Sequence, residues 1–232
     1  MLEYGDAINQ QLEYGHATMD QLENEIKKAI QGFEKNNLFI DKIRENDLGI
    51  EDYHRILLGV FSQVFMSSSS FALASASLGE KYQIAKDYLL HHAEEEKSHW
   101  VWILNDLAST GYKGPDPRIM HPHFTTQGYF AYAMYLGYQF PIGRLCMAAV
   151  LEGISGSLGP KYGPQVMTML KIAPEFMQFF KSHGELDKGH SQEVLDAIRK
   201  TELTGYEYWK LIGVAKNTSE LYKSIYNSAV SR

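Results

Sequence analysis

Three residues of metal-binding type lie close together near the end of the chain, as His183, Asp187 and His190. Their spacing of four and three puts all three on one face of a helix, whereas a strand would divide them between its two faces. The same stripe carries apolar residues on both sides: Phe176, Phe179, Phe180, Val194, Ala197 and Ile198. Burying two imidazoles and a carboxylate there is costly unless they are paired. A metal ion would pair them; a wet interface or a His–Asp pair within the core are the alternatives.

A second apolar stripe with polar interruptions occupies a helix predicted over residues 79–111. It runs through Ala85, Leu89, His92, Glu96, His99, Ile103 and Leu107 in steps of three and four. Glu96 and His99 form the i, i+3 carboxylate–histidine pair that helical di-iron proteins use. Glu95 and His92, four and seven residues before His99, are the reserve candidates for this ligand position.

A third candidate ligand is Glu152, which follows the apolar run Leu145-Cys-Met-Ala-Ala-Val-Leu. A carboxylate in such a segment needs a partner. Arg144, two turns earlier, could pair with it, anchor a substrate carboxylate or lie on the surface. We expect Arg144 and Tyr138, from an aromatic helix over 129–140, to contact the substrate.

The rest of the chain predicts an all-α protein, because no segment shows the alternating pattern of a half-buried strand. Helices are expected over 18–34, 38–46, 51–78, 79–111, 129–140, 141–157, 164–172, 174–201 and 204–231, with a turn-rich break at 158–164. We expect a single domain over 1–232. It divides into N-terminal helices (1–48), a core with the candidate ligands (49–200) and a C-terminal helix (201–232).

Composition excludes several classes of function. The net charge is −6 and no Lys/Arg cluster occurs, which argues against nucleic acid as a partner. Cys146 is the one cysteine, so an internal disulfide is impossible and a reducing, cytoplasmic compartment is expected. We expect no signal peptide and no membrane span, because neither a cationic leader nor an uninterrupted apolar run of 18 residues is present.

Together the stripes supply six donors: Glu96, His99, Glu152, His183, Asp187 and His190. Three carboxylates and three imidazoles suit two first-row ions that each retain open positions. No thiolate cluster exists for structural zinc or an iron–sulfur centre. The excess positive charge of two divalent ions over three carboxylates could hold a substrate carboxylate, and open positions on an oxidisable metal indicate O₂ chemistry.

This ordered set of motifs resembles the heme-oxygenase-like di-iron oxidases and oxygenases, over roughly residues 50 to 200. That superfamily shares its fold with heme oxygenase, the TenA thiaminases and the PQQ-synthesis oxidase. The resemblance implies a bundle of about seven helices, two irons and O₂ as co-substrate. It implies His99, Glu152, His183, Asp187 and His190 as ligands, with Glu96 ahead of Glu95 as the sixth. His92 and Gln63 stand where some members carry glutamate.

The resulting prediction is a non-heme di-iron enzyme that oxidises a small carboxylate-bearing molecule. The nitrile- and alkene-forming members of the superfamily favour an amino acid with an apolar or aromatic side chain. Oxidative C–C cleavage or N-oxygenation would be the reaction, in a natural-product pathway, and a homodimer is expected. The alternatives are a TenA-like thiaminase or hydrolase using Cys146, a heme oxygenase with His16 as the proximal ligand, and a non-catalytic metal-binding helical protein.

Overall fold

The computed structural model describes residues 16–231, except the side chains of residues 183–188. Within this part the chain forms α-helices and short 3₁₀ turns and no strand, which confirms the all-α class. The α-helices are α2 (Met19–Gly32), α3 (Leu38–Arg44), α4 (Ile50–Ser77), α5 (Gln83–Glu96), α6 (Trp100–Ser109), α7 (Phe124–Gln139), α8 (Gly143–Leu170), α9 (Gln178–Lys200) and α10 (Gly205–Val230). The 3₁₀ turns are Glu80–Tyr82, Pro117–Ile119 and Pro174–Phe176.

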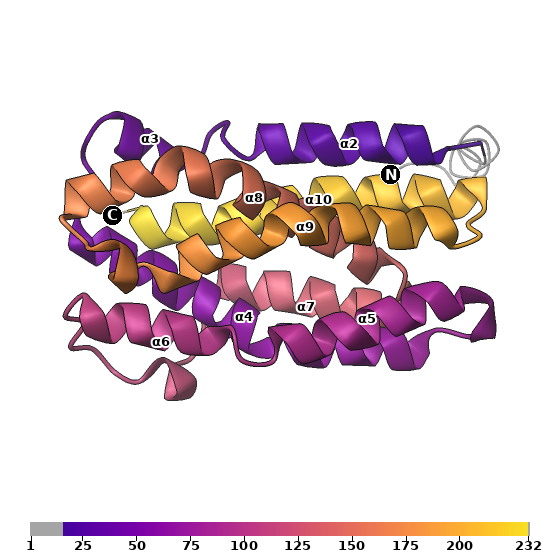
Figure 1. The fold of residues 1–232 in the computed structure, drawn as a ribbon, viewed down its shortest axis with the longest axis horizontal. Helices are drawn as coiled ribbons and strands as arrows, with labels where there is room; N and C mark the ends of the chain where they lie inside the picture. The colour runs from indigo at the N-terminus through magenta and orange to yellow at the C-terminus, as the bar shows by residue number, and fades with distance from the viewer. Residues whose placement is uncertain (1–15, 232) are drawn as a thin grey trace, which may run out of the picture.

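Most helices run along the long axis of the bundle (Figure 1). Helices α8 and α9 form the most extensive helix pair, while α4 packs against α5 and α7. Helices α2 and α10 pack against each other and against α8. Because α5 also contacts both α8 and α9, the three helices that carry the candidate ligands meet in the interior.

Local capping fixes where several helices begin. The Thr18 side chain accepts a hydrogen bond from the backbone N–H of Gln21, and the Gln21 side-chain oxygen accepts one from the backbone N–H of Thr18, which makes a capping box for α2. Thr204 and Glu207 form the same motif at the start of α10. Asn37 starts α3 by accepting from two backbone N–H groups with its side-chain oxygen. Polar residues at the helix starts thus reproduce the element boundaries expected from the sequence.

The prediction of one helix over 79–111 is wrong, because α5 ends at Glu96 and α6 begins at Trp100. The last turn of α5 carries Glu94, Glu95 and Glu96, and the negative end of the helix dipole disfavours anions there. The His99 N–H donates to the carbonyl of Glu96 at 3.3 Å, a tightened turn between the two helices. Glu96 and His99 therefore lie on opposite sides of a break and not on one continuous helix.

The predicted break at 158–164 is also wrong, because α8 continues through Pro160 and Pro164. A proline inside a helix removes one donor and crowds the carbonyl four residues earlier. Neighbouring glycines at 156, 159 and 163 bring no side chain to the crowded turns. Helix α8 consequently reaches the corner between α2 and α3.

Helix α4 is long and apolar enough to cross a membrane by length and composition alone. In the bundle, however, it contacts α5, α6, α7, α8 and α10. It also buries the polar side chains of Asp52, Ser67 and Ser70 inside the protein. Its hydropathy therefore reflects burial as a central helix.

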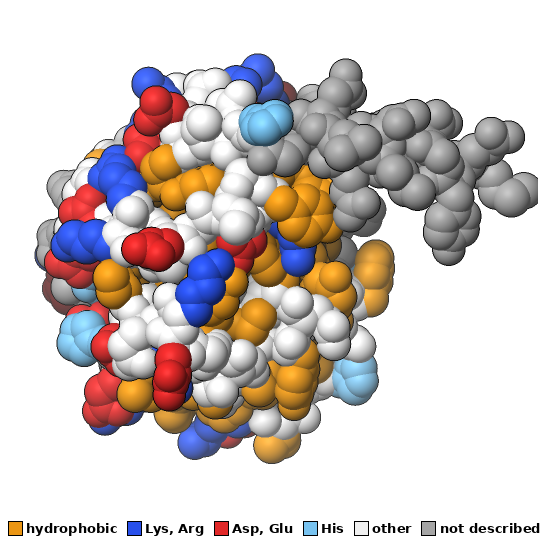
Figure 2. All heavy atoms as spheres, turned by 90° about the vertical axis from the view of Figure 1, so that its right-hand side faces the viewer, with side chains coloured by type: hydrophobic (Ala, Val, Ile, Leu, Met, Phe, Trp, Pro, Cys, Tyr) orange, Lys and Arg blue, Asp and Glu red, His pale blue; other side chains and the backbone are white. Residues whose placement is uncertain are grey.

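At the end of the bundle where α4 leads toward α5, acidic and basic side chains lie interspersed among scattered apolar ones (Figure 2).

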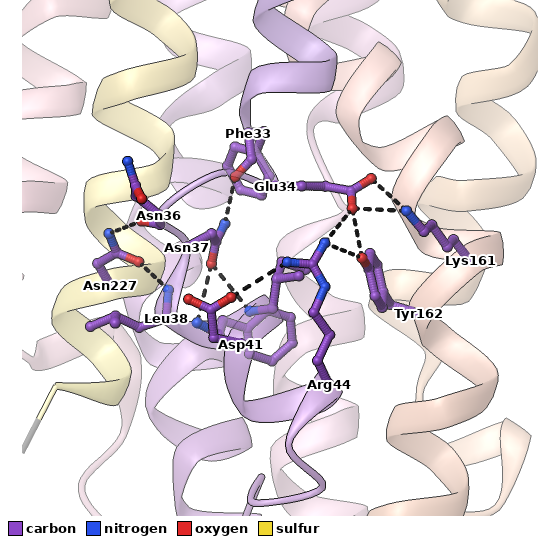
Figure 3. A network of polar contacts seen from close by, with 12 residues as sticks. Phe33, Glu34, Asn36, Asn37, Leu38, Asp41, Arg44, Lys161, Tyr162 and Asn227 are labelled. Atoms are coloured by element: carbon purple, nitrogen blue, oxygen red, sulfur yellow. Dashed lines mark hydrogen bonds and ion pairs between the residues drawn. The ribbon is translucent and has the colours of Figure 1, made fainter.

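A polar network joins α8 to the α2–α3 corner (Figure 3). One Glu34 oxygen accepts hydrogen bonds from Arg44 at 2.8 Å and from the Tyr162 hydroxyl at 2.6 Å. Lys161 binds both Glu34 oxygens at 2.8 Å. Burial raises the pKa of Glu34, but the hydrogen bonds and charges of Lys161, Tyr162 and Arg44 outweigh burial and lower it overall.

Glu34→Gln is expected to lower the free energy of unfolding by about 1 kcal/mol at pH 7, because the substitution removes the shared anion of the network. The lowered pKa means that this stabilisation is present above pH 4.5 and is lost as the pH falls through the folded-state pKa. Urea unfolding at pH 7 and pH 3.5 would measure it. Asp41→Asn, which weakens a more exposed pair with the same Arg44, is the control. Equal stabilities of the wild type and Glu34→Gln at pH 7 would refute the role of the network.

Candidate metal centre

Three side chains from separate helices converge in the interior of the bundle: His92 of α5, Glu152 of α8 and His190 of α9. One ligand atom from each lies within 4.8 Å of the others. His92 Nε2 is 3.1 Å from Glu152 Oε1, and the two imidazole ring centroids are 5.7 Å apart. The arrangement provides two nitrogen donors and one carboxylate.

Two members of the cluster, His92 and Glu152, are nearly inaccessible to solvent, and His190 is half-buried. His92 is 2% exposed and Glu152 is 6% exposed. Despite the short distance to His92, neither Glu152 oxygen has a hydrogen bond of good geometry among the described residues. Burial raises the pKa of Glu152 beyond the opposing influence of His92. Burial lowers the pKa of His92, but the Glu152 carboxylate outweighs burial and raises it. Such a pair is costly in an apolar interior.

A cation would relieve that cost, and the donor set indicates which one. Two histidines and one carboxylate with open positions are the ligands of many non-heme iron(II) oxygenases. Hard divalent cations such as Mg²⁺ and Ca²⁺ prefer sites made of oxygen alone. The residues of this cluster therefore fit iron.

Glu95, a reserve candidate, lies beside the cluster. Its carboxylate oxygens are 3.6 Å from His92 Nδ1 and 3.9 Å from His190 Nε2. A further oxygen–nitrogen distance of 3.3 Å joins it to the exposed His91. Both reserve residues, His92 and Glu95, are thus within reach of His190. The sequence placed His92 on the same helical stripe as Glu96 but ranked it behind Glu96.

Glu96 and His99 occupy the adjacent turn. Glu96 Oε1 lies 2.9 Å from His99 Nδ1, and Ser67 Oγ lies 3.4 Å from the other Glu96 oxygen. The His99 ring stacks on Trp102 with centroids 4.2 Å apart. Their assignment as metal ligands stays a prediction. Helix α9 includes His183 and Asp187 in its backbone, but their side chains lie outside the described residues.

An apolar cavity adjoins the cluster, and His92, Glu96 and Glu152 form part of its wall. Most of its other lining side chains are hydrocarbon or aromatic, among them Phe33, Phe39, Ile40, Val64, Phe71, Ala148, Leu151, Phe180, Tyr222 and Tyr226. No described residue of α7 lines the cavity. Tyr138 does not line this cavity and is 65% exposed, so its expected contact with the substrate stays a prediction. Helix α7 turns Tyr129, Ala133 and Leu136 inward and Tyr138 outward.

Arg144 lines the same cavity and is fully buried. Among the described contacts it makes no ion pair with Glu152, which was one of the three roles considered for Arg144. Cys146 does not line the cavity; its thiol donates to the Leu211 carbonyl at 3.3 Å, and burial raises the pKa of the thiol. A thiolate nucleophile there is unfavourable. His16, the candidate heme ligand, is exposed.

Asp106 of α6 positions helix α9, which carries His190. Its two carboxylate oxygens accept hydrogen bonds from the backbone N–H groups of Gln178 at 2.7 Å and Phe179 at 2.9 Å. These are the first N–H groups of α9, which have no partner within the helix. Sequence reasoning missed this cap, because the capping residue lies more than seventy positions before the helix that it caps.

The described part of the chain is thus an all-helical bundle in which two histidines and a carboxylate converge beside an apolar cavity. The chain belongs to the family of iron-containing redox enzymes, whose sequence pattern matches residues 49–207. No curated protein matches the sequence.

Solved structures confirm the heme-oxygenase-like fold. A Shewanella denitrificans protein, described as a domain of unknown function with a heme oxygenase-like fold, superposes with a TM-score of 0.82. It shares 22% identity, and the match covers 91% of each chain. A TenA homologue from P. horikoshii matches with a TM-score of 0.71 and 13% identity over 90% of this chain and 96% of that one. A TenA homologue from Pseudomonas syringae pv. tomato gives 0.68 and 14% identity over 92% and 94%.

Proposed function

We propose that this chain is a non-heme di-iron, O₂-dependent oxidase or oxygenase that acts on a small carboxylate-bearing molecule. An amino acid with an apolar or aromatic side chain is the substrate class that we favour, and oxidative C–C cleavage or N-oxygenation is the reaction. The observation that carries this proposal is the cluster of His92, Glu152 and His190, of which His92 and Glu152 are buried in the wall of an apolar cavity. Membership of the iron-containing redox family supports it.

His92, Glu152 and His190 would hold one iron, with Glu95 beside them. Glu96, His99, His183 and Asp187 are the candidates for holding a second iron. When bound, iron supplies the redox chemistry by which O₂ oxidises an organic substrate. The protein residues contribute binding and orientation, and the apolar cavity wall excludes water from the reacting groups.

The Cys146 alternative receives no support, because this buried thiol faces α10 and not the cavity. A purely structural metal site is the other alternative. In that case removal of the metal should unfold the domain. The two functions therefore differ in whether the metal-free protein stays folded and in whether O₂ is consumed.

An anaerobic Fe(II) titration of the metal-free protein tests the proposal. We expect two irons per chain and, after mixing with O₂, oxygen uptake that increases when a suitable amino acid is present. Circular dichroism of the metal-free protein should retain the helical spectrum. Failure to bind iron would refute the proposal. If the protein bound iron but consumed no oxygen with any candidate substrate, a structural role of the metal would be the better explanation.

A further inference from the structure

Arg144 is a buried cation without a matching anion among the described residues. Its side chain is 2% exposed, and its Nη2 donates to Ser70 Oγ at 3.0 Å. The guanidinium carbon lies 4.1 Å from the centroid of the Phe71 ring. Nε and Nη1, in contrast, have no hydrogen-bond partner in the described part of the chain. Buried charges in proteins are normally paired, so this arginine points to a missing anion.

The location of Arg144 connects it to the metal centre. Arg144, His92 and Glu152 line one cavity. Phe71 contacts both ends of this arrangement, since its ring also meets the His92 ring edge-on with centroids 4.6 Å apart. Burial lowers the pKa of Arg144, and nearby Tyr129 and Glu96 only partly oppose that effect; no ion pair within 4.0 Å joins Arg144 and Glu96 among the described contacts. An anion bound by Arg144 would therefore share the cavity with the metal ligands.

The rest of the cavity defines the other end of the ligand. Phe33, Phe39 and Tyr226 line it with aromatic rings. An arginine presents paired donors that suit a carboxylate, and an apolar pocket favours a hydrocarbon or aromatic body. The unpaired donors and the apolar lining are thus complementary to the two halves of an apolar monocarboxylate.

We propose that Arg144 binds the carboxylate of an apolar monocarboxylate and holds its hydrocarbon or aromatic part in the cavity beside His92 and Glu152. This inference rests on the proposed function for its role in catalysis, but binding itself requires no iron. An amino acid and a fatty acid offer the same carboxylate, so the probes must separate these two sources.

Calorimetric titration of the metal-free protein with matched probes tests the inference. 3-Phenylpropionate and 3-phenylpropanol differ in the carboxylate, whereas L-phenylalanine adds the amino group and decanoate replaces the ring by an alkyl chain. We expect the wild type to bind acid more tightly than alcohol, and Arg144→Met to weaken acid binding roughly 10- to 100-fold while leaving alcohol binding unchanged. Tighter binding of L-phenylalanine would identify an amino acid as the source, and tighter binding of decanoate a fatty acid.

If Arg144 instead had a structural role, Arg144→Met should lower the melting temperature. The binding role predicts that removing this unpaired buried charge does not lower it. Arg144→Met should then melt at or above the wild-type temperature and bind as much iron as the wild type. If Arg144→Met does not fold, Arg144→Lys takes its place in the test, because lysine retains the charge but not the paired donors of the guanidinium. Weaker acid binding is then expected of Arg144→Lys. Equal binding of acid and alcohol, or acid binding unchanged in the folded variant, would overturn the inference. If the wild type took up no iron, that result would contradict the proposed function and leave the inference about Arg144 standing.

Discussion

Glu152→Gln is expected to abolish iron binding at the cluster without destabilising the metal-free protein. Glu152 is the one carboxylate in the group of three donors, and both of its oxygens are buried without a well-formed hydrogen bond. Loss of an outer-shell partner already weakens metal affinity about 10- to 100-fold, and loss of a direct ligand should exceed that. The uncharged amide removes the cost of burying an anion, so the melting temperature of the metal-free protein should stay equal or rise.

Iron stoichiometry by anaerobic titration and thermal unfolding of the metal-free protein measure the two halves of this prediction. Glu193→Gln is the matched control, because it changes an exposed glutamate on α9 one turn from His190. The control should bind iron as the wild type does. If Glu152→Gln retained full iron binding, the cluster would not be the metal site. If it lost binding only by unfolding, Glu152 would be structural.

Asp106→Ala is expected to destabilise the protein by about 2 kcal/mol and to weaken iron binding by His190. The substitution leaves the N–H groups of Gln178 and Phe179 without their acceptors at the start of α9. Loss of a helix cap and of buried acceptors each costs about 1 kcal/mol or more. Because α9 carries His190, loosening its first turns should reduce the order of the ligand set. Thermal unfolding and iron titration of the same samples would test both effects.

The pH dependence of Asp106 provides a sharper test. Burial, only partly offset by hydrogen bonds from the backbone N–H groups of Phe179 and Gln178, raises the pKa of Asp106 from 3.8 to about 6. A raised folded-state pKa favours the folded protein at low pH, and that contribution is lost as the pH rises through about 6. Relative to Asp106→Asn, the wild type should therefore lose stability of the order of 2 to 3 kcal/mol between pH 3.5 and pH 7. If the difference in stability between the wild type and Asp106→Asn did not change with pH, the folded-state pKa of Asp106 would not be raised.

Helical periodicity was enough to predict most of the elements, because the apolar stripes follow the helical repeat wherever one face packs inward. The errors came at the two places where backbone chemistry and packing compete. Three glutamates end α5 before the stripe ends, and α8 continues past two prolines. Neither outcome changes the apolar pattern, so the pattern alone could not reveal them.

The candidate ligands show the same difference between what the residue pattern predicts and what helix packing decides. Spacing identified Glu152 and His190 as polar residues on buried faces, and the structure brings them within 4.8 Å of one another. The third member of the described cluster is His92, which the sequence ranked behind Glu96. Whether His92 or Glu96 faces Glu152 and His190 depends on how α5 is rotated about its axis relative to α8 and α9. That rotation follows from side-chain packing between helices, which no single helical stripe contains.

The sequence by itself determined that the chain is all helical and that several carboxylates and imidazoles must be buried, because both properties follow from residue spacing along one helix. Only the tertiary structure decided which of these donors meet. It also decided that Arg144 faces the cavity and Tyr138 the solvent, and that Asp106 caps a helix more than seventy residues later. Those facts depend on distances between segments far apart in sequence, which are set by the packing of the whole bundle.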